Sequence, residues 1–74
     1  MNTEKLKYNH NYQVKSLTGD NSVCERLLEM GLTEDQIFKV LQKLPFGEPY
    51  IVLVNNLFVA LREQELKCIQ IHPQ

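Results

Sequence analysis

The chain has 74 residues, 43% hydrophobic and 23% charged, which is the balance of one small globular domain with one core. Its formal net charge of -1 argues against a nucleic-acid-binding protein, because such proteins usually carry a basic face. The longest apolar stretches, residues 50–54 and 57–61, are too short to span a bilayer, and residues 2–11 lack the apolar segment of a signal peptide. We therefore expect a cytoplasmic protein that neither binds nucleic acid nor inserts into a membrane.

The N-terminal part of the chain divides into a polar stretch and the start of a folded region. Residues 1–11 are mostly polar, so we expect a flexible tail there and a folded domain over residues 12–72. In the segment 12–17, Tyr12 and Val14 alternate with polar residues, which predicts a strand. The Thr-Gly-Asp-Asn sequence that follows is typical of a turn.

A short helix is predicted from Ser22 to the glycine at position 31. Ser22 followed by Glu25 matches a capping box, in which each residue bonds the backbone N–H of the other. Gly31 can adopt the left-handed conformation that ends a helix, and Leu32 would then fold back onto Leu27. The predicted apolar stripe consists of Val23, Leu27 and Met30, widened by Cys24 and Leu28.

The segment from residue 33 to residue 44 has two interpretations. Ile37, Val40, Leu41 and Leu44 follow the spacing of a helix, and this local pattern favours a helix. In the alternative strand, Phe38, Val40 and Leu44 would point inward and the lysines outward. The residues alone leave both interpretations open, because short apolar runs do not separate them.

Three further strands are predicted after a turn at residues 45–49, which contain two prolines and a glycine. Residues 50–54 and 57–61 are rich in β-branched and aromatic residues, and Asn55-Asn56 between them predicts a hairpin with a type I′ turn. After a short polar link at residues 62–65, for which one helical turn is an alternative, Ile69 and Ile71 share one face of a last strand. The chain is thus mainly β, and we expect a small barrel of about five strands with one short helix that buries both apolar faces of the hairpin.

No catalytic motif is present. The glycines form no phosphate-binding loop, no HExxH motif occurs, and neither Ser16 nor Ser22 lies in a nucleophile elbow. We therefore expect a binding module and not an enzyme. We also expect reduced thiols, no cofactor and no tight metal site, because the potential ligands lack the spacing of known metal sites; these ligands are Cys24, Cys68, His10 and His72.

Most of the chain resembles the ferrous iron transport protein A (FeoA) family. The resemblance is carried in order by Arg26-Leu-Leu-Glu-Met-Gly-Leu-Thr33, Val40-Leu41, Pro45-Phe-Gly-Glu-Pro49, Ala60-Leu-Arg-Glu63 and Ile69. One departure is Glu34-Asp35, where family members often have Pro-Gly. The resemblance implies an SH3-like FeoA domain over residues 12–72, with a strand over residues 38–44.

The resemblance also implies a function and a partner. FeoA proteins are thought to assist FeoB, the membrane ferrous iron transporter, so we expect a cytosolic accessory protein that binds FeoB, with its GTP-binding domain as the suspected contact. Two alternatives are kept. One is a three-helix module similar to ubiquitin-associated domains, suggested by Leu27-Leu-Glu-Met-Gly-Leu-Thr-Glu-Asp-Gln36. The other is a stand-alone, metal-responsive regulator. Weak self-association also stays open.

The predicted partner surface is the turn at residues 45–49 and its border. Pro45, Phe46, Pro49 and Tyr50 lie in or beside a turn, where not all four side chains can reach a small core. An exposed aromatic residue can carry much of the energy of a protein–protein contact. The alternative for Phe46 is a structural one, in which its ring plugs one end of the barrel.

Overall fold

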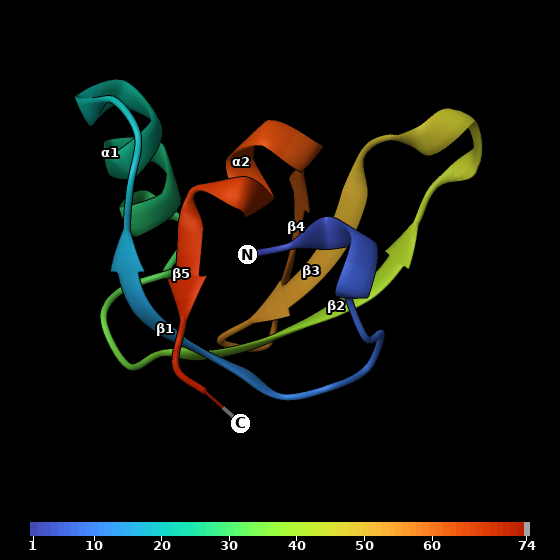
Figure 1. The fold of residues 1–74 in the computed structure, drawn as a ribbon, viewed down its shortest axis with the longest axis horizontal. Coiled ribbons are helices and arrows are strands. Elements are labelled where there is room, and N and C mark those ends of the chain that lie inside the picture. Colours follow the sequence, from blue (N-terminus) through green and yellow to red (C-terminus); the bar gives the residue numbers. More distant parts are fainter. Residues whose placement is uncertain (74) are drawn as a thin grey trace.

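A computed structural model describes residues 1–73, whose five strands form one curled antiparallel sheet with short helices at its ends (Figure 1). The order of the strands in the sheet is β4-β3-β2-β1-β5. In chain order the elements are η1 (Thr3–Lys5), β1 (Tyr12–Leu17), α1 (Asn21–Glu29), β2 (Ile37–Lys43), η2 (Pro45–Gly47), β3 (Tyr50–Val54), β4 (Leu57–Leu61), α2 (Glu63–Lys67) and β5 (Ile69–Ile71). The mainly β prediction is confirmed, and the three-helix alternative is wrong. The polar link before β5 forms a second short α-helix, in agreement with the alternative of one helical turn.

The ambiguous segment forms strand β2. Phe38 and Val40 are buried in the core, and β2 pairs with β1 on one side and with β3 on the other. A helix in this place would leave the backbone N–H and C=O groups of both neighbouring strands without partners, which is costly in a core. Tertiary pairing therefore overrides the helical spacing of the local sequence. A bulge falls between Val40 and Gln42.

The N-cap of helix α1 lies two residues before the predicted one. Asp20, not Ser22, is the N-cap, and its Oδ1 accepts hydrogen bonds from the Val23 N–H at 2.9 Å and the Ser22 hydroxyl at 2.8 Å. The capping box of Ser22 and Glu25 is thus wrong. A carboxylate accepts more strongly than a hydroxyl and interacts favourably with the positive end of the helix dipole, so Asp20 is the better cap.

The predicted C-terminal end of α1 is confirmed. Gly31 has a φ of 96°, its N–H donates to the Leu28 carbonyl at 2.9 Å, and the Leu32 N–H donates to the Leu27 carbonyl at 3.1 Å. These two bonds define a Schellman motif. Leu27 and Leu32 are fully buried, whereas Leu28, predicted in the stripe, is 46% exposed. The buried stripe is therefore narrower than predicted.

Two tight turns use residues that tolerate positive φ. Asn55 and Asn56 have φ values of 52° and 62°, which confirms the predicted hairpin turn between β3 and β4. In the turn before β2, Asp35 has a φ of 67° and the Gln36 N–H donates to the Thr33 carbonyl. Asp35 thus takes the left-handed position for which glycine is the usual residue. This explains how the chain keeps the turn without the Pro-Gly pair.

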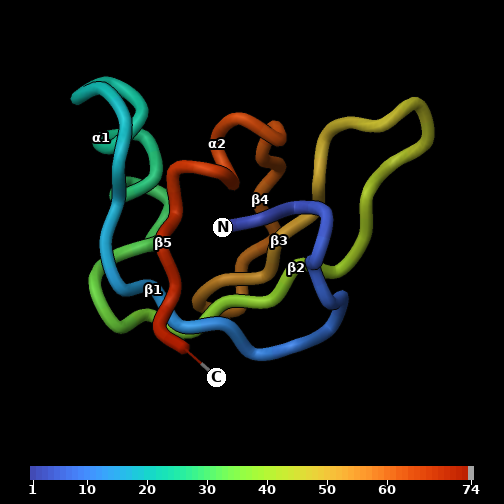
Figure 2. Tube along the Cα trace, in the orientation of Figure 1, coloured from blue at the N-terminus to red at the C-terminus, as the bar shows by residue number. Residues whose placement is uncertain are grey.

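One core lies inside the curl of the sheet. The N-terminal residues 1–11 pack against this core. Met1 and Leu6 pack against the core, and the Lys7 N–H donates to the Tyr12 hydroxyl at 2.9 Å. No pattern in the sequence predicts these contacts. Figures 1 and 2 show the N-terminal segment beside α2. The core consists of Tyr12, Val14, Leu27, Leu32, Phe38, Val40, Tyr50, Val52, Val54, Leu61, Leu66 and Ile69.

The barrel does not bury both faces of the β3–β4 hairpin, so that prediction is wrong. Tyr50, Val52 and Val54 point into the core. On the opposite face Ile51 and Leu53 are only half-buried, and Phe58 is 71% exposed. The five strands curl around one interior, and the described residues provide no second layer outside β3 and β4.

Candidate partner-binding site

The connection between β2 and β3 projects from the body of the molecule, at the upper right of Figures 1 and 2. Its base is closed by a backbone hydrogen bond of 3.0 Å from the Leu44 N–H to the Pro49 carbonyl. Inside it, the Gly47 N–H donates to the Leu44 carbonyl at 3.2 Å. The loop is therefore a hydrogen-bonded hairpin end with its own defined conformation.

Phe46 lies at the tip of this loop and makes no contribution to the core. Its side chain is fully exposed, at 107% of the reference area, and its φ is 73°. The ring therefore does not plug the barrel. Positive φ is uncommon for a residue with a bulky side chain and costs about 1–3 kcal/mol, so such residues concentrate at functional sites. An exposed aromatic ring in a strained backbone is the most distinctive surface feature of the loop.

The two prolines of the predicted site lie at different depths. Pro45 is exposed beside Phe46, whereas Pro49 is half-buried. Pro49 also borders a surface groove of about 270 Å³, whose other lining residues are Arg26, Glu48, Ala60 and Arg62. Pro45 and Phe46 thus share the projecting end, and Pro49 belongs to its base.

Tyr50 lies in the core and not on the loop surface. Its side chain is 2% exposed, and its hydroxyl donates a hydrogen bond of 3.1 Å to Glu63 Oε1. The Lys43 ammonium lies 5.5 Å from the centre of the ring. The structure thus separates Tyr50 from Phe46, and the surface that a partner can contact contains Phe46 but not the Tyr50 ring.

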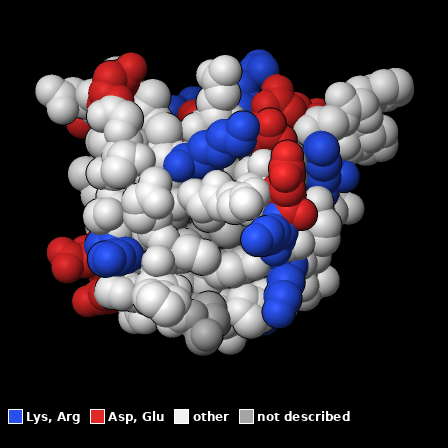
Figure 3. All heavy atoms as spheres, in the orientation of Figure 1, with Lys and Arg blue, Asp and Glu red and all other residues white. Residues whose placement is uncertain are grey.

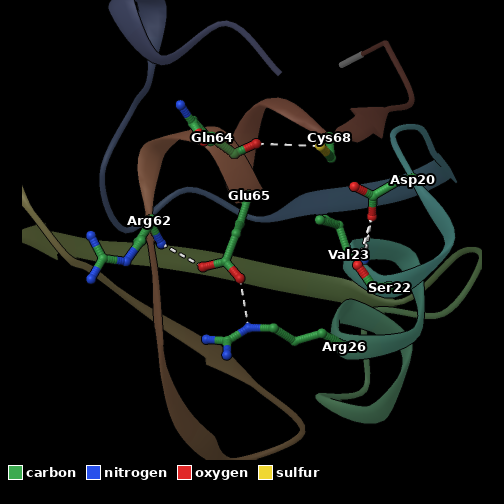
Figure 4. Close-up of polar contacts among 8 residues, drawn as sticks. All are labelled: Asp20, Ser22, Val23, Arg26, Arg62, Gln64, Glu65 and Cys68. Atoms are coloured by element: carbon green, nitrogen blue, oxygen red, sulfur yellow. Dashed lines mark hydrogen bonds and ion pairs between the residues drawn. The ribbon is translucent and has the colours of Figure 1, made fainter.

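Glutamate side chains join the base of the loop to α2, and α2 to α1. Glu48 Oε1 accepts from the Glu63 N–H at 2.9 Å, at the start of α2. Glu65 accepts from the Arg62 N–H at 2.8 Å and pairs with the Arg26 Nε of α1 at 2.6 Å (Figure 4). The sequence contains no signal for the role of Glu48. Its contacts hold the loop in a fixed position relative to the sheet.

The Tyr50–Glu63 bond shifts the ionisation of both groups. The hydrogen bond from the Tyr50 hydroxyl holds the pKa of the Glu63 carboxyl below its usual 4.5. Burial, followed by the bond to Glu63, raises the pKa of Tyr50. Because the folded state favours ionised Glu63, the resulting stability is present above the unfolded pKa of 4.5 and is lost as the pH falls through the lower folded pKa.

We expect Tyr50→Phe to weaken this acid dependence. The substitution removes the main cause of the Glu63 pKa shift and leaves the ring in place. Urea unfolding at pH 7, 5 and 3 should show a smaller acid-induced fall in the free energy of unfolding than in the wild type. Asp20, whose pKa is lowered by the Val23 N–H, lies outside this contact and provides the same acid response in both proteins. An identical fall in both proteins would contradict the assigned role of the Tyr50 hydroxyl.

The four potential metal ligands are dispersed. His72 Nε2 lies 2.8 Å from Asp35 Oδ1, and the His10 ring contacts that of Tyr12 at 4.8 Å between centroids. Cys24 and Cys68 are half-buried free thiols. Within residues 1–73, no group of three or more His, Cys, Asp or Glu residues is arranged to hold a metal ion.

Charges of both signs are distributed over the face shown in Figure 3, and the projection at the upper right is drawn almost entirely in white. The projection is thus nearly free of charged side chains in this view, and because its tip consists of Pro45, Phe46 and Gly47, it offers an apolar contact. Among the helices of residues 1–73, none combines the length and the apolar character needed to cross a membrane.

Comparisons with known proteins agree with this fold. The FeoA domain family model matches residues 3–73. The FeoA protein of Chlorobium tepidum has 30% identity and a TM-score of 0.84, with 97% of this chain and 69% of that chain covered. The Stenotrophomonas maltophilia FeoA, solved with zinc and described as a prokaryotic SH3 domain protein, has 26% identity and a TM-score of 0.79, with coverage of 97% and 89%.

A third solved structure is longer than this chain. Iron(II) transport protein A of Clostridium thermocellum has 24% identity and a TM-score of 0.85; the match covers 97% of this chain but 44% of that one. No curated protein matches. The family model covers nearly the whole chain, and solved FeoA structures share its SH3-like fold. This chain therefore belongs to the FeoA domain family, whose members are non-catalytic accessory proteins associated with ferrous iron transport.

Proposed function

We propose that this protein is a cytosolic accessory of ferrous iron uptake that binds the cytosolic GTP-binding domain of the FeoB transporter. The family match supports the link to ferrous iron transport. Phe46 supports a binding role, because a fully exposed aromatic ring is held at the tip of a hydrogen-bonded loop. The proposed contact consists of Pro45 and Phe46, with Pro49 at its base.

The geometry of the loop favours binding because it fixes Phe46 in advance. Ordering a flexible side chain and its loop costs free energy on association, and a preformed loop lowers this cost. The bonds from Leu44 to Pro49 and from the α2 backbone to Glu48 provide that order. Phe46 then enters an apolar pocket of the partner, as interface anchors commonly do.

The proposed mechanism is a shift in the population of transporter states. A protein that binds two states equally changes neither population, so this chain must bind one state of the transporter more tightly. A tenfold preference corresponds to about 1.4 kcal/mol. The loop contact would then couple the presence of this protein to iron uptake without any chemical step of its own.

We expect Phe46→Asp to abolish most of the binding without loss of stability. The removal of an anchor of this kind costs about 2 kcal/mol or more, which is near thirtyfold in affinity. Phe46→Gly should weaken binding to a similar extent and should raise the free energy of unfolding by up to about 1 kcal/mol, because glycine relieves the strain at positive φ. Calorimetric titration with the cytosolic domain of the cognate FeoB measures affinity, and urea unfolding measures stability.

Leu28→Asp provides a matched control, because Leu28 is an exposed apolar residue on α1. It should bind like the wild type. If Phe46→Asp also binds normally, the loop is not the contact. If the wild-type chain itself shows no affinity for the FeoB domain, the proposed function is wrong.

A further inference from the structure

The outer face of strands β2, β3 and β4 carries a continuous set of apolar side chains. In each strand, the residues between the core positions point to this face. Leu53 pairs with Lys39 on one side and with Phe58 on the other, and Ile51 pairs with Ala60. Phe58 is 71% exposed and Ile37 is 45% exposed. We call this surface the outer face; it comprises Ile37, Lys39, Gln42, Ile51, Leu53, Phe58 and Ala60, of which only Lys39 and Gln42 are polar.

Lys39 is the one charged residue of the outer face. It is half-buried and lies in the same cross-strand row as Leu53 and Phe58. In residues 1–73, no carboxylate lies within ion-pairing distance of its ammonium group, and the outer face contains no acidic residue. A partner that covered this face would have to supply a carboxylate, because an ammonium buried without a counter-charge is costly.

The shape of the face fits a helix. Three adjacent strands span about 10 Å, since neighbouring strands lie about 4.8 Å apart. A helix with its side chains has a diameter of about 10–12 Å. One helix can therefore cover the row from Lys39 to Phe58. A second copy of this chain fits poorly, because its outer face would bring another lysine. The carboxylate that borders the face, Glu48 beside Ala60, already accepts from the Glu63 N–H and pairs with Arg62.

We propose that the outer face binds an amphipathic helix of the partner, with an Asp or Glu in the apolar stripe of that helix opposite Lys39. This inference rests on the proposed function in its choice of partner, the cytosolic domain of FeoB. It adds a second contact surface that adjoins the Phe46 loop, since Pro49 and Ala60 line one groove, and it specifies the chemistry of the segment that binds there.

Substitutions at Lys39 test whether the partner helix places a carboxylate opposite this residue. Lys39→Met keeps an apolar stem of similar length and removes the charge. If a carboxylate faces Lys39, Lys39→Met should weaken binding to the FeoB domain about tenfold, and Lys39→Glu should weaken it further. If the face makes only apolar contacts, Lys39→Met should instead tighten binding. Lys15→Met is the matched control, because Lys15 is exposed on β1, and it should bind like the wild type.

Phe58→Asp tests the apolar part of the face. Because Phe58 is mainly exposed, the variant should keep the wild-type melting temperature and lose at least tenfold in affinity for the FeoB domain. The affinity is measured by calorimetric titration, with Leu28→Asp as the control for a new surface carboxylate.

The outcomes separate the two proposals. Normal binding by Lys39→Met, Lys39→Glu and Phe58→Asp, together with loss of binding in Phe46→Asp, would overturn the outer-face inference and leave the proposed function standing. A wild-type chain that does not bind the FeoB domain overturns both. Sedimentation velocity of the chain alone gives a third outcome. A dimer that Phe58→Asp dissociates and Lys39→Met strengthens would show that a second copy covers the face, against our inference.

Discussion

Tyr50→Asp is expected to leave most of the protein unfolded at 25 °C. Tyr50 is 2% exposed and belongs to the core, and its hydroxyl bonds Glu63 of α2. Truncation of a buried aromatic residue costs about 3–5 kcal/mol. A new carboxylate there would also lie in an apolar site close to Glu63, which adds a desolvation penalty and like-charge repulsion. The sum is comparable to the whole stability of a small domain, about 5–15 kcal/mol.

Two variants isolate the cause of this loss. Tyr50→Phe keeps the ring and removes only the hydroxyl, so we expect it to cost about 1 kcal/mol, the net value of one hydrogen bond. Phe46→Asp adds the same carboxylate four residues away on the exposed tip, where it should leave the melting temperature unchanged. Circular dichroism melts of the three variants provide the comparison. A folded Tyr50→Asp protein with a wild-type melting temperature would show that the ring is not part of the core.

Gly31→Val is expected to destabilise the protein by about 2 kcal/mol or more, because a β-branched residue is strongly disfavoured in the left-handed region. The φ of Gly31 is 96°, and the two hydrogen bonds of the Schellman motif require this conformation. A Cβ at this position would also lie 2.7 Å from the Asn55 Nδ2 of the β3–β4 turn. The Asn55 side chain would have to turn away, which adds to the cost of the strained backbone. Urea unfolding measures the change.

Alanine substitutions at two glycines separate the backbone strain at positive φ from the steric contact of the new Cβ atom. Gly47 has a similar φ of 94°, but the nearest atom to its Cβ would be Lys43 Cε at 3.8 Å. Gly47→Ala should therefore report strain alone, whereas Gly31→Ala should report strain and the contact with Asn55. The double variant Gly31→Ala/Asn55→Gly should recover the contact part, and a double-mutant cycle measures it. If Gly31→Ala costs no more than Gly47→Ala, the contact with Asn55 does not limit this position.

The sequence determined the features that depend on local backbone chemistry. Gly31 and the two asparagines of the hairpin turn adopt the positive φ values that their residue types favour. The alternation of Tyr12 and Val14 marks β1 because a strand exposes every second residue to one face. The absence of catalytic motifs agrees with a non-catalytic family. These features need no knowledge of distant contacts.

Only the tertiary structure decided that residues 37–43 form a strand and not a helix. It also decided which aromatic residue beside the β2–β3 turn is exposed and which residue caps α1. The spacing from Ile37 to Leu44 fits a helix locally, but pairing with β1 and β3 makes it a strand. Phe46 and Tyr50 are both aromatic residues beside one turn, and the course of the loop places the first in solvent and the second in the core. Asp20 replaces Ser22 as the cap because the turn before α1 brings its carboxylate to the helix end. In each case several conformations are acceptable locally, and long-range pairing and packing select one of them.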